Sequence, residues 1–309
     1  MVLGIDIGGT NIKFGIVDEN YQILAHRSIP TRKEAGGDAI VSDIINVCLE
    51  LKELYPYDKF GIGTPGVVDS EHGICVSAAN LPFSNTALVP MVSAATGLKG
   101  ALANDANCAI WGELYAGSGK QYKNFLMITL GTGVGGGIVI EGHLLHGAHG
   151  SGAEIGHMVL NRDETIPCNC GKRGCVEQYC SATGIVRLAN EALAATDEVT
   201  ALRTNEAITC KYIFDCAKSG DALALEVLDR YYRYMGEFLA NLCDVVDPDA
   251  VVLGGGVSKA GQVLLDGIRP YFDQYVFHAA KDARFALASL GNDAGAYGAF
   301  KLALDAFGK

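Results

Sequence analysis

Three cysteines and a histidine form the densest group of potential metal ligands in the sequence. Cys168, Cys170 and Cys175 give the spacing C-x-C-x₄-C, and His157 lies 11 residues before the first of them. Three thiolates and one imidazole complete a tetrahedral shell without an open position, which is typical of structural Zn²⁺. We therefore predict a structural zinc site. Free or disulfide-bonded surface thiols are the alternative, which a reducing compartment disfavours.

Several carboxylates lie in sequence surroundings suited to binding hydroxyl groups or accepting a proton from them. Asp105 lies between Asn104 and Asn107 at a strand-to-helix junction, where it can accept a proton from an alcohol or serve as the helix N-cap. Glu154 and Glu177 bracket the predicted zinc site. Attachment to that site would make both glutamates rigid, as bidentate recognition of neighbouring hydroxyls requires.

Three glycine-rich turns follow apolar strands: Gly8-Gly9-Thr10, the run from Gly131 to Gly137, and Gly254-Gly255-Gly256. Backbone amides in such turns hold phosphate without any net positive charge, and the hydroxyls of Thr10 and Thr132 add donors. The third turn provides a flat surface suited to a nucleotide base or ribose. Any one of them can also be only a turn.

Gly131 to Gly136 satisfies G-x-G-x-x-G, but the chain continues into a β-rich run instead of a helix. A dinucleotide fold needs a helix there, so a nicotinamide enzyme is disfavoured. Asp6, at the end of the first strand, is placed to steer Mg²⁺ on a phosphate tail. Lys13 can reach the same tail or point to solvent.

The elements that must position these groups follow from apolar periodicity. Strands are predicted at 2–7, 12–17, 22–29, 59–63, 101–103 and 250–253, and helices at 36–55, 106–115 and 294–306. Residues 9–17 align with residues 131–139, and both segments connect two strands directly. This repeat predicts a duplicated α/β unit, with two lobes facing each other across a cleft. A chance likeness of two glycine hairpins is the alternative.

Composition limits the class of partner and the compartment. The 309 residues carry 24 Lys and Arg against 35 Asp and Glu, a net charge of −11, which argues against nucleic acid as a partner. We see no basic leader and no apolar run of membrane-spanning length, so we expect a cytoplasmic protein without a membrane partner. Most of the six scattered cysteines, and Cys180 beside the metal motif, are expected to be small core residues.

Six motifs in this order resemble the ROK family of sugar kinases: D-x-G-G-T (Asp6–Thr10), N-D-A-N (Asn104–Asn107), L-G-T-G-x-G-G-G (Leu130–Gly137), E-x-G-H (Glu154–His157), C-x-C-G-x-x-G-C-x-E (Cys168–Glu177) and L-G-G-G (Leu253–Gly256). The resemblance covers essentially the whole chain. It implies the α/β, actin-like ATPase (ribonuclease H-like) fold. We place a smaller lobe at 1–117 plus 294–309, and a larger lobe carrying the zinc site at 118–293.

The resemblance also implies roles for individual residues. Asp105 would be the general base for the sugar hydroxyl. Sugar-binding residues would be Asn104, Asp105, Glu154, His157 and Glu177, with Asn80 and the backbone at Gly66 as weaker candidates. ATP and its Mg²⁺ would be held by Asp6, Gly8, Gly9, Thr10, Asn11, Lys13, Thr132, Gly133, Gly254, Gly255 and Gly256. The Zn²⁺ ligands would be His157, Cys168, Cys170 and Cys175, so that His157 serves both metal and sugar.

The expected activity is that of an ATP-dependent hexokinase, most similar to bacterial glucokinases, that transfers the γ-phosphoryl group to the 6-hydroxyl of glucose. An N-acetylmannosamine kinase or another hexose kinase is the alternative within the family. A sugar-sensing binding protein without turnover is the alternative from another class. The DNA-binding repressors of the family carry an N-terminal helix-turn-helix extension, which we do not expect here because Met1 almost directly precedes the first glycine turn. The family also implies lobe closure on the sugar, and a homodimer or homotetramer.

Overall fold

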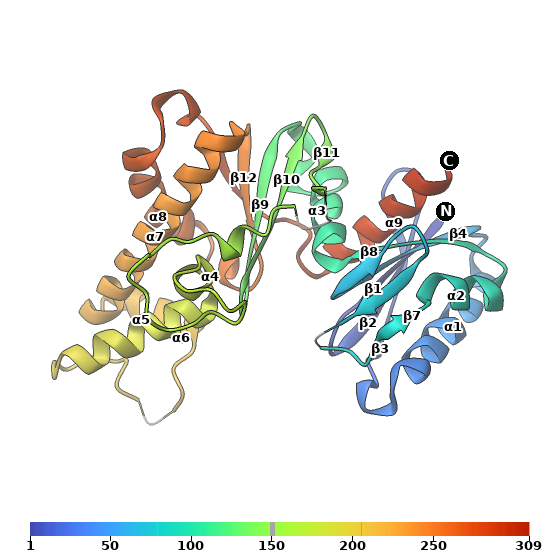
Figure 1. Cartoon of the computed structure of the whole chain (residues 1–309), viewed down its shortest axis with the longest axis horizontal. Helices are drawn as coiled ribbons and strands as arrows, with labels where there is room; N and C mark the ends of the chain where they lie inside the picture. Colours follow the sequence, from blue (N-terminus) through green and yellow to red (C-terminus); the bar gives the residue numbers. More distant parts are fainter. Residues whose placement is uncertain (79, 149–151, 205, 309) are drawn as a thin grey trace. The chain divides into compact units, whose positions relative to one another are not determined.

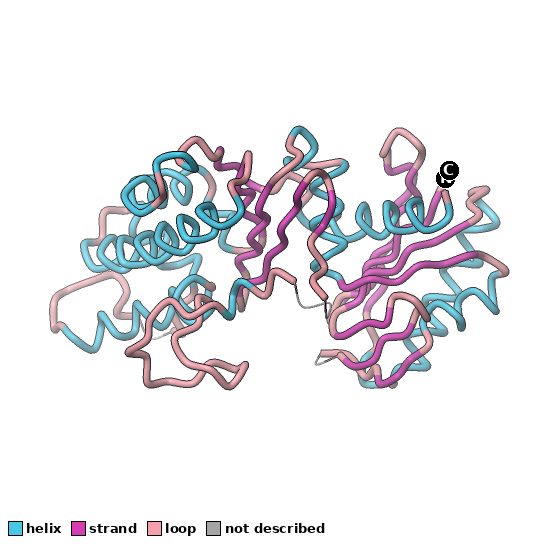
Figure 2. The backbone as a smooth tube through the Cα atoms, turned by 45° about the horizontal axis from the view of Figure 1, so that its top comes forward, coloured by secondary structure: helices cyan, strands magenta, loops and turns pink. Residues whose placement is uncertain are grey.

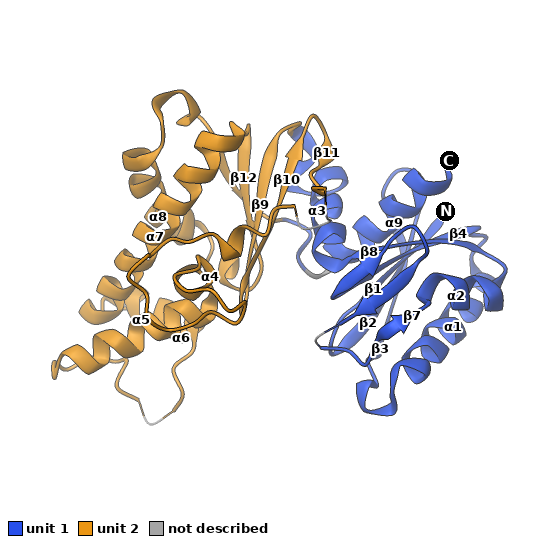
Figure 3. Cartoon of the chain, viewed as in Figure 1, with its two compact units in different colours: residues 1–121, 289–309 blue, residues 122–288 orange. Residues whose placement is uncertain are grey.

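The structure, a computed structural model, describes residues 1–78, 80–148, 152–204 and 206–308 (Figure 1). The chain divides into two compact units (Figure 3). Unit 1 consists of Met1–Gln121 and Ser289–Lys309, and unit 2 consists of Tyr122–Ala288. A five-stranded sheet lies in each unit (Figure 2).

The sheet of unit 1 has the order β3-β2-β1-β4-β8. Its strands are β1 (Val2–Ile7), β2 (Asn11–Val17), β3 (Ile23–Pro30), β4 (Lys59–Thr64) and β8 (Lys99–Asn104). Strand β2 is antiparallel to both of its neighbours, β1 and β3. Strands β1, β4 and β8 run parallel to one another. A second, three-stranded sheet contains β5 (Val67–Asp69), β6 (Ile74–Ser77) and β7 (Ser84–Thr86). The helices are α1 (Gly37–Leu54), α2 (Leu88–Thr96), α3 (Asp105–Tyr115) and α9 (Ala294–Phe307), with short 3₁₀ turns η1 (Lys33–Ala35), η2 (Ser118–Gln121) and η6 (Gly291–Asp293).

Alternating residues of β1 and β4 explain how helices cover the sheet of unit 1. Leu3 and Ile5 are fully buried and belong to the same apolar cluster as Ile44 of α1. Gly4 and Gly61 instead let α9 pack directly on the strands: a Cβ added at Gly61 would lie 1.7 Å from the carbonyl oxygen of Ala299. The last helix of the chain is therefore built into the unit formed by its first residues.

Unit 2 repeats this arrangement with the sheet order β11-β10-β9-β12-β13. Its strands are β9 (Phe125–Leu130), β10 (Val134–Ile140), β11 (His143–Leu144), β12 (Ala250–Gly254) and β13 (Arg284–Leu287). The helices are α4 (Glu177–Cys180), α5 (Ala182–Ala195), α6 (Cys210–Lys218), α7 (Ala222–Val246) and α8 (Gln262–Tyr275), with 3₁₀ turns η3 (Ile155–His157), η4 (Val257–Ala260) and η5 (His278–Ala280). Leu126, Ile128 and Leu130 of β9 pack with the long helices in one apolar core.

The two sheets share one topology, because each begins with an antiparallel hairpin around a glycine turn and adds parallel strands on the other side. This is the ribonuclease H-like arrangement. Its presence in both units confirms the duplication that the repeat predicted.

The units divide at 121/122 and 288/289, whereas the sequence placed the borders at 117/118 and 293/294. The difference has a local cause. Glu113 of α3 accepts hydrogen bonds from the backbone N–H groups of Ser118 and Leu290, at 2.8 Å each. These bonds fasten to unit 1 two residues, Ser118 and Leu290, that the sequence placed in the larger lobe.

The structure also bears on the burial of Cys180 and on long apolar helices. Cys180 is fully buried in the core of unit 2, as predicted. Within the described residues, no helix combines the length and the apolar character needed to cross a bilayer.

Candidate active site

Asp105 directly follows β8 and is the first residue of α3. Asn104 has an extended backbone (φ −65°, ψ 145°), and its side chain accepts a hydrogen bond from the backbone N–H of Ala106 at 2.9 Å, so Asn104 is the N-cap of α3. The expectation that Asp105 caps this helix is therefore wrong. Asparagine and aspartate are both good N-caps, but an N-cap residue has a non-helical backbone, and here that residue is Asn104. Asp105 is the first helical residue, and its Oδ1 accepts from the same N–H group.

The surroundings of Asp105 favour a role as a base. Burial is the main cause that raises the pKa of this carboxyl, and backbone hydrogen bonds offset part of the rise. A carboxylate with a raised pKa is a stronger proton acceptor than an exposed one. Asp105 can therefore receive a proton from a hydroxyl placed at the end of β8.

Gly66 and Asn80 lie close to other candidates in unit 1. The side-chain amide of Asn104 donates to the carbonyl oxygen of Gly66 at 3.0 Å. Gly66 has φ +98°, and a Cβ there would lie 2.0 Å from the carbonyl oxygen of Ser77, so only glycine fits. Asn80 lies beside Gly9, since its Cβ is 4.0 Å from where a Gly9 Cβ would be.

The first glycine turn joins β1 to β2, with Thr10 and Asn11 exposed. The turn is closed by a hydrogen bond from the Gly8 N–H to the Asn11 carbonyl oxygen (3.0 Å). Thr31, which the sequence did not single out, also holds it: its hydroxyl donates to Gly8 O (2.7 Å) and its N–H to Thr10 O (2.8 Å). The turn is thus rigid before any ligand arrives.

Asp6 lies just before this turn, opposite Lys13 in the register of β1 and β2. Burial raises the pKa of Asp6 to about 6; Lys13 counteracts this shift, and the nearby Asp105 adds to it. The carboxylate rests against the start of α9, because a Cβ at Gly295 would lie 2.5 Å from Asp6 Cγ. Asp6 and Asp105 therefore form one acidic group in unit 1.

The second glycine turn, between β9 and β10, is held by Glu177. One oxygen of this carboxylate, Oε2, accepts a hydrogen bond from the Val134 N–H at 3.1 Å. A Cβ at Gly133 would lie 2.1 Å from the same oxygen, so glycine is required there. The hydroxyl of Thr183, which the sequence did not indicate, donates to the carbonyl oxygen of Thr132 at 2.7 Å. These contacts bring Thr132, Gly133 and Glu177 together.

The four predicted metal ligands converge in unit 2. One ligand atom from each of His157, Cys168, Cys170 and Cys175 lies within 4.8 Å of all the others. The sulfurs of Cys170 and Cys175 are 3.6 Å apart, and the sulfur of Cys168 is 3.9 Å from His157 Nδ1. Zn–S bonds of about 2.3 Å in a tetrahedron require sulfurs about 3.8 Å apart, so the donor set fits Zn²⁺ in size and chemistry.

The metal-ligand cluster is connected to both predicted sugar-binding glutamates. The Cys168 thiol donates to Oε1 of Glu177 at 3.8 Å, which leaves Glu177 between the cluster and the glycine turn. Glu154 is exposed at the start of η3, beside the cluster residue His157. Gly156 rests on β10, where a Cβ would lie 2.0 Å from Val134 O, so the E-x-G-H segment is seated on the same strand.

A pocket of about 420 Å³ opens beside the third glycine turn. Gly255 has φ +84°, and a Cβ there would lie 2.5 Å from Leu130 O. The pocket is lined by Ala182, Thr209, Cys210, Lys211, Phe214, Asp215, Lys218, Gly256, Val257, Lys259 and Ala260. Its three lysines carried no sequence signal. The third glycine turn is followed by the short 3₁₀ turn η4, and α8 begins at Gln262.

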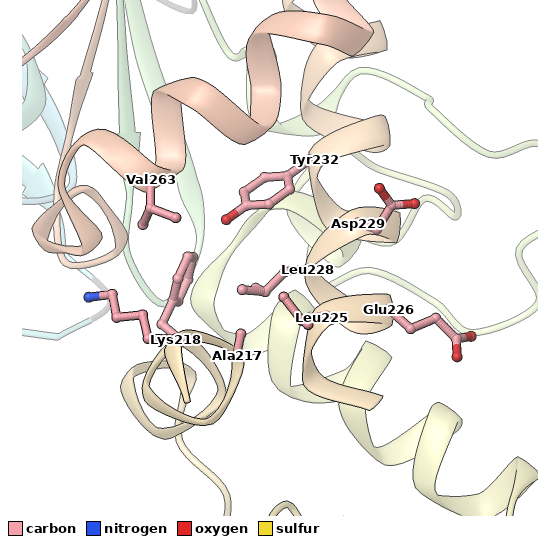
Figure 4. A pocket seen from close by; sticks show the side chains of 9 residues that line it. Ala217, Lys218, Leu225, Glu226, Leu228, Asp229, Tyr232 and Val263 are labelled. Carbon is pink, nitrogen blue, oxygen red and sulfur yellow. The ribbon is translucent and has the colours of Figure 1, made fainter. Parts of the chain in front are cut away.

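A second pocket, of about 520 Å³, lies among α6, α7 and α8 (Figure 4). Phe214 and Lys218 of α6 line both pockets. Leu225, Leu228 and Val263 make the second pocket largely apolar. It contains none of the residues that the motifs indicated.

Comparisons with known proteins agree with the motifs. The chain matches the ROK family over residues 2–306. It is 40% identical to a glucokinase from Halalkalibacterium halodurans, covering 96% of this chain and 92% of that one, and 34% identical to a glucokinase from Thermotoga maritima (99% and 98%). The crystal structure of a ROK family glucokinase from Streptomyces griseus with glucose and AMPPNP has a TM-score of 0.78 at 35% identity, covering 98% of this chain and 99% of that one. The chain has the actin-like ATPase fold and belongs to the ROK family.

Proposed function

We propose that the protein is an ATP-dependent hexokinase that transfers the γ-phosphoryl group to the 6-hydroxyl of glucose. The observation that carries this proposal is the placement of Asp105: a half-buried carboxylate, fixed by a capped helix start at the end of a parallel strand. The 40% identity to a glucokinase over nearly the whole chain supports glucose as the acceptor.

In the proposed reaction, Asp105 accepts the proton of the 6-hydroxyl while the hydroxyl oxygen attacks the γ-phosphorus in line. ADP leaves, and no bond forms between enzyme and phosphoryl group. Phosphoryl transfer of this kind depends mainly on positioning and charge stabilisation. The hydrogen bond from Ala106 N–H to Asp105 Oδ1 supplies part of the positioning.

The nucleotide is proposed to bind unit 2 through its base and ribose, and both glycine turns through its phosphates. The pocket beside Gly256 has the size for a base and ribose. Asp215 pairs with Lys211 in its lining, and Lys218 and Lys259 leave that lining with a net positive charge. Thr10 and Asn11 on the first turn, and Thr132 and Gly133 on the second, are the proposed phosphate donors, with Gly8 and Gly9 shaping the first. Lys13, Gly254 and Gly255 complete the proposed set.

Metal ions are proposed in two separate places. Mg²⁺ bound with ATP would neutralise phosphate charge, and Asp6 is the carboxylate proposed to steer it. Zn²⁺ would be held by His157 and the three cysteines as a structural ion, because four protein donors leave no open position. Glu154, His157 and Glu177, joined to this cluster, are the proposed sugar ligands of unit 2, while Asn104, Asn80 and the Gly66 backbone are those of unit 1.

The test is sugar-dependent formation of ADP from ATP–Mg²⁺ with glucose, N-acetylmannosamine, mannose, fructose and allose. We expect glucose to have the highest kcat/KM. A preference for another sugar would keep the kinase and change its acceptor. No turnover on any sugar, from folded and zinc-loaded protein, would contradict the kinase proposal and favour a binding protein. We also propose a homodimer or homotetramer, which light scattering after size exclusion tests directly.

A further inference from the structure

A fully buried glutamate lies where the chain leaves unit 1 and where it returns. Glu113 is on the last turn of α3 and has no exposed surface. The chain passes to unit 2 just after Gln121 and comes back at Ser289. Burying a carboxylate completely is costly unless hydrogen bonds replace its lost water. The partners of Glu113 therefore indicate what this residue is for.

Its two oxygens hold both connecting segments. Oε2 accepts from the Ser118 N–H at 2.8 Å and from the Ser289 hydroxyl at 3.3 Å, while Oε1 accepts from the Leu290 N–H at 2.8 Å. Residues 118 and 290 are far apart in sequence, yet a single carboxylate joins their backbones.

The outgoing segment is shaped to fit this carboxylate. Gly117 lies so close that a Cβ there would be 2.0 Å from Oε2 of Glu113. The other end of the same helix carries Asp105, the proposed base. Helix α3 thus connects the base directly to the point where both segments are fastened.

We propose that Glu113 is a positioning residue for phosphoryl transfer: it clamps to α3 both segments through which the chain passes between the units, and so fixes the helix that carries Asp105. This proposal rests on the proposed kinase activity, because it assigns a role within that reaction. Misplacing reacting groups by about 1 Å can cost about 100-fold in rate. The clamp touches none of the proposed ligand-binding residues, so it should act on kcat more than on binding.

The experiment combines Glu113→Gln with Gly117→Ala. Glutamine has one acceptor oxygen and one NH₂ group, so at least one of the two segments loses its acceptor. Gly117→Ala displaces the carboxylate without changing its chemistry. Leu114→Ala is the matched control, because Leu114 is the next residue of the same helix, is also buried, and has no part in the clamp.

In both clamp variants we expect kcat to fall about tenfold or more, with the Kd values for glucose and AMPPNP changing less than about threefold. Hydrogen exchange at the amide of Ser118, Leu290 or both should accelerate about tenfold. Leu114→Ala should lower Tm and leave kcat within about twofold of the wild type.

A kcat within twofold of the wild type in folded Glu113→Gln and Gly117→Ala, or unchanged exchange at both amides, would overturn the proposal. So would a loss of kcat in Leu114→Ala that matches theirs. If Glu113→Gln does not fold, Gly117→Ala decides the matter. Inactivity of the wild type on every sugar would instead contradict the kinase proposal, and amide exchange would still test the clamp.

Discussion

The two glycine turns of this protein have the same place in duplicated units, yet different residues provide their charge. In the register of the two hairpins, the opposed residues Asp6 and Lys13 of unit 1 correspond to Thr129 and Gly135 of unit 2. Unit 1 carries its charged pair within the hairpin strands. In unit 2 neither position is charged, and Glu177 supplies a carboxylate to the turn from the end of the cysteine-rich segment.

The two turns are therefore held in different ways. The first turn is held by hydrogen bonds within its own hairpin and by Thr31, which directly follows β3 of the same sheet. The second turn depends on a segment whose shape is set by the metal-ligand cluster, since Glu177 contacts both Val134 and Cys168. Loss of the cluster should therefore disturb unit 2 and spare the first turn.

The largest effect is expected from Asp105→Asn. Asparagine keeps the size and a hydrogen-bond acceptor but cannot take the proton, so kcat should fall about 10²- to 10⁴-fold. Glucose affinity, measured by calorimetry, should stay within about threefold, because the fold and the Asn104 cap are untouched. Turnover near the wild-type level would refute the role of Asp105 as base.

Removal of the metal, or Cys170→Ser, tests the dependence of the second turn on the cluster. We expect loss of bound zinc and a glucose Kd raised about tenfold. The amide of Val134 should exchange faster while that of Gly8 keeps its protection. Cys243→Ala, which removes a buried thiol of α7 outside the cluster, is the control. Unaltered affinity in a protein shown to hold no metal would make the cluster incidental.

The charged pair of unit 1 predicts a pH dependence. Because the pKa of Asp6 is raised to about 6 by folding, its ionisation opposes folding, and stability should fall as pH rises from about 4 to 6. The penalty above pH 6 is at most about 3 kcal/mol. Asp6→Asn should therefore raise Tm at pH 7.5 and leave it unchanged at pH 3.5, as scanning calorimetry would measure. An equal Tm shift at both values would contradict this account.

The same carboxylate is proposed to act in its ionised form. The wild-type kcat should accordingly decrease as the pH is lowered through about 6. A rate that stays flat from pH 7.5 to 5, in protein that remains folded, would argue against an active role for Asp6.

The smallest effect concerns the two threonines that hold the turns. Thr31 and Thr183 each donate a hydroxyl to a turn carbonyl at 2.7 Å, but Thr31 is buried and Thr183 is exposed. Thr31→Val should cost about 1 kcal/mol of unfolding free energy, and Thr183→Val less, because water can replace an exposed donor. Urea unfolding of the two variants makes the comparison; a larger cost for Thr183→Val would reverse our ranking.

The parts of the fold that sequence could predict are those whose pattern is local. The strands on either side of the first glycine turn, and the last helix, were predicted within two residues. Their apolar alternation and glycines need no knowledge of the rest of the chain. The N-cap of α3 was misassigned because Asn104 and Asp105 are neighbours with equal capping ability, and only the backbone angles distinguish them.

Residues whose partners are distant in sequence could not be found in this way. Lys211, Lys218 and Lys259 meet at one pocket only because α6 packs beside η4. Glu113 has the sequence context of an ordinary helix end, and its importance depends on Leu290, 177 residues further along the chain. Contacts of this kind leave no periodic signal. Motif resemblance indicated the glycine turns and Glu177, but not Thr31 and Thr183, which also hold those turns.

The central claim is that the γ-phosphoryl group of ATP is transferred to the 6-hydroxyl of glucose. Phosphorus NMR of a reaction with ATP–Mg²⁺, glucose and the wild-type protein tests it most directly. We predict that ADP and glucose 6-phosphate appear in equal amounts, and that 6-deoxyglucose binds without giving any sugar phosphate. Phosphate on another hydroxyl, or ADP formed with free phosphate alone, would contradict the account.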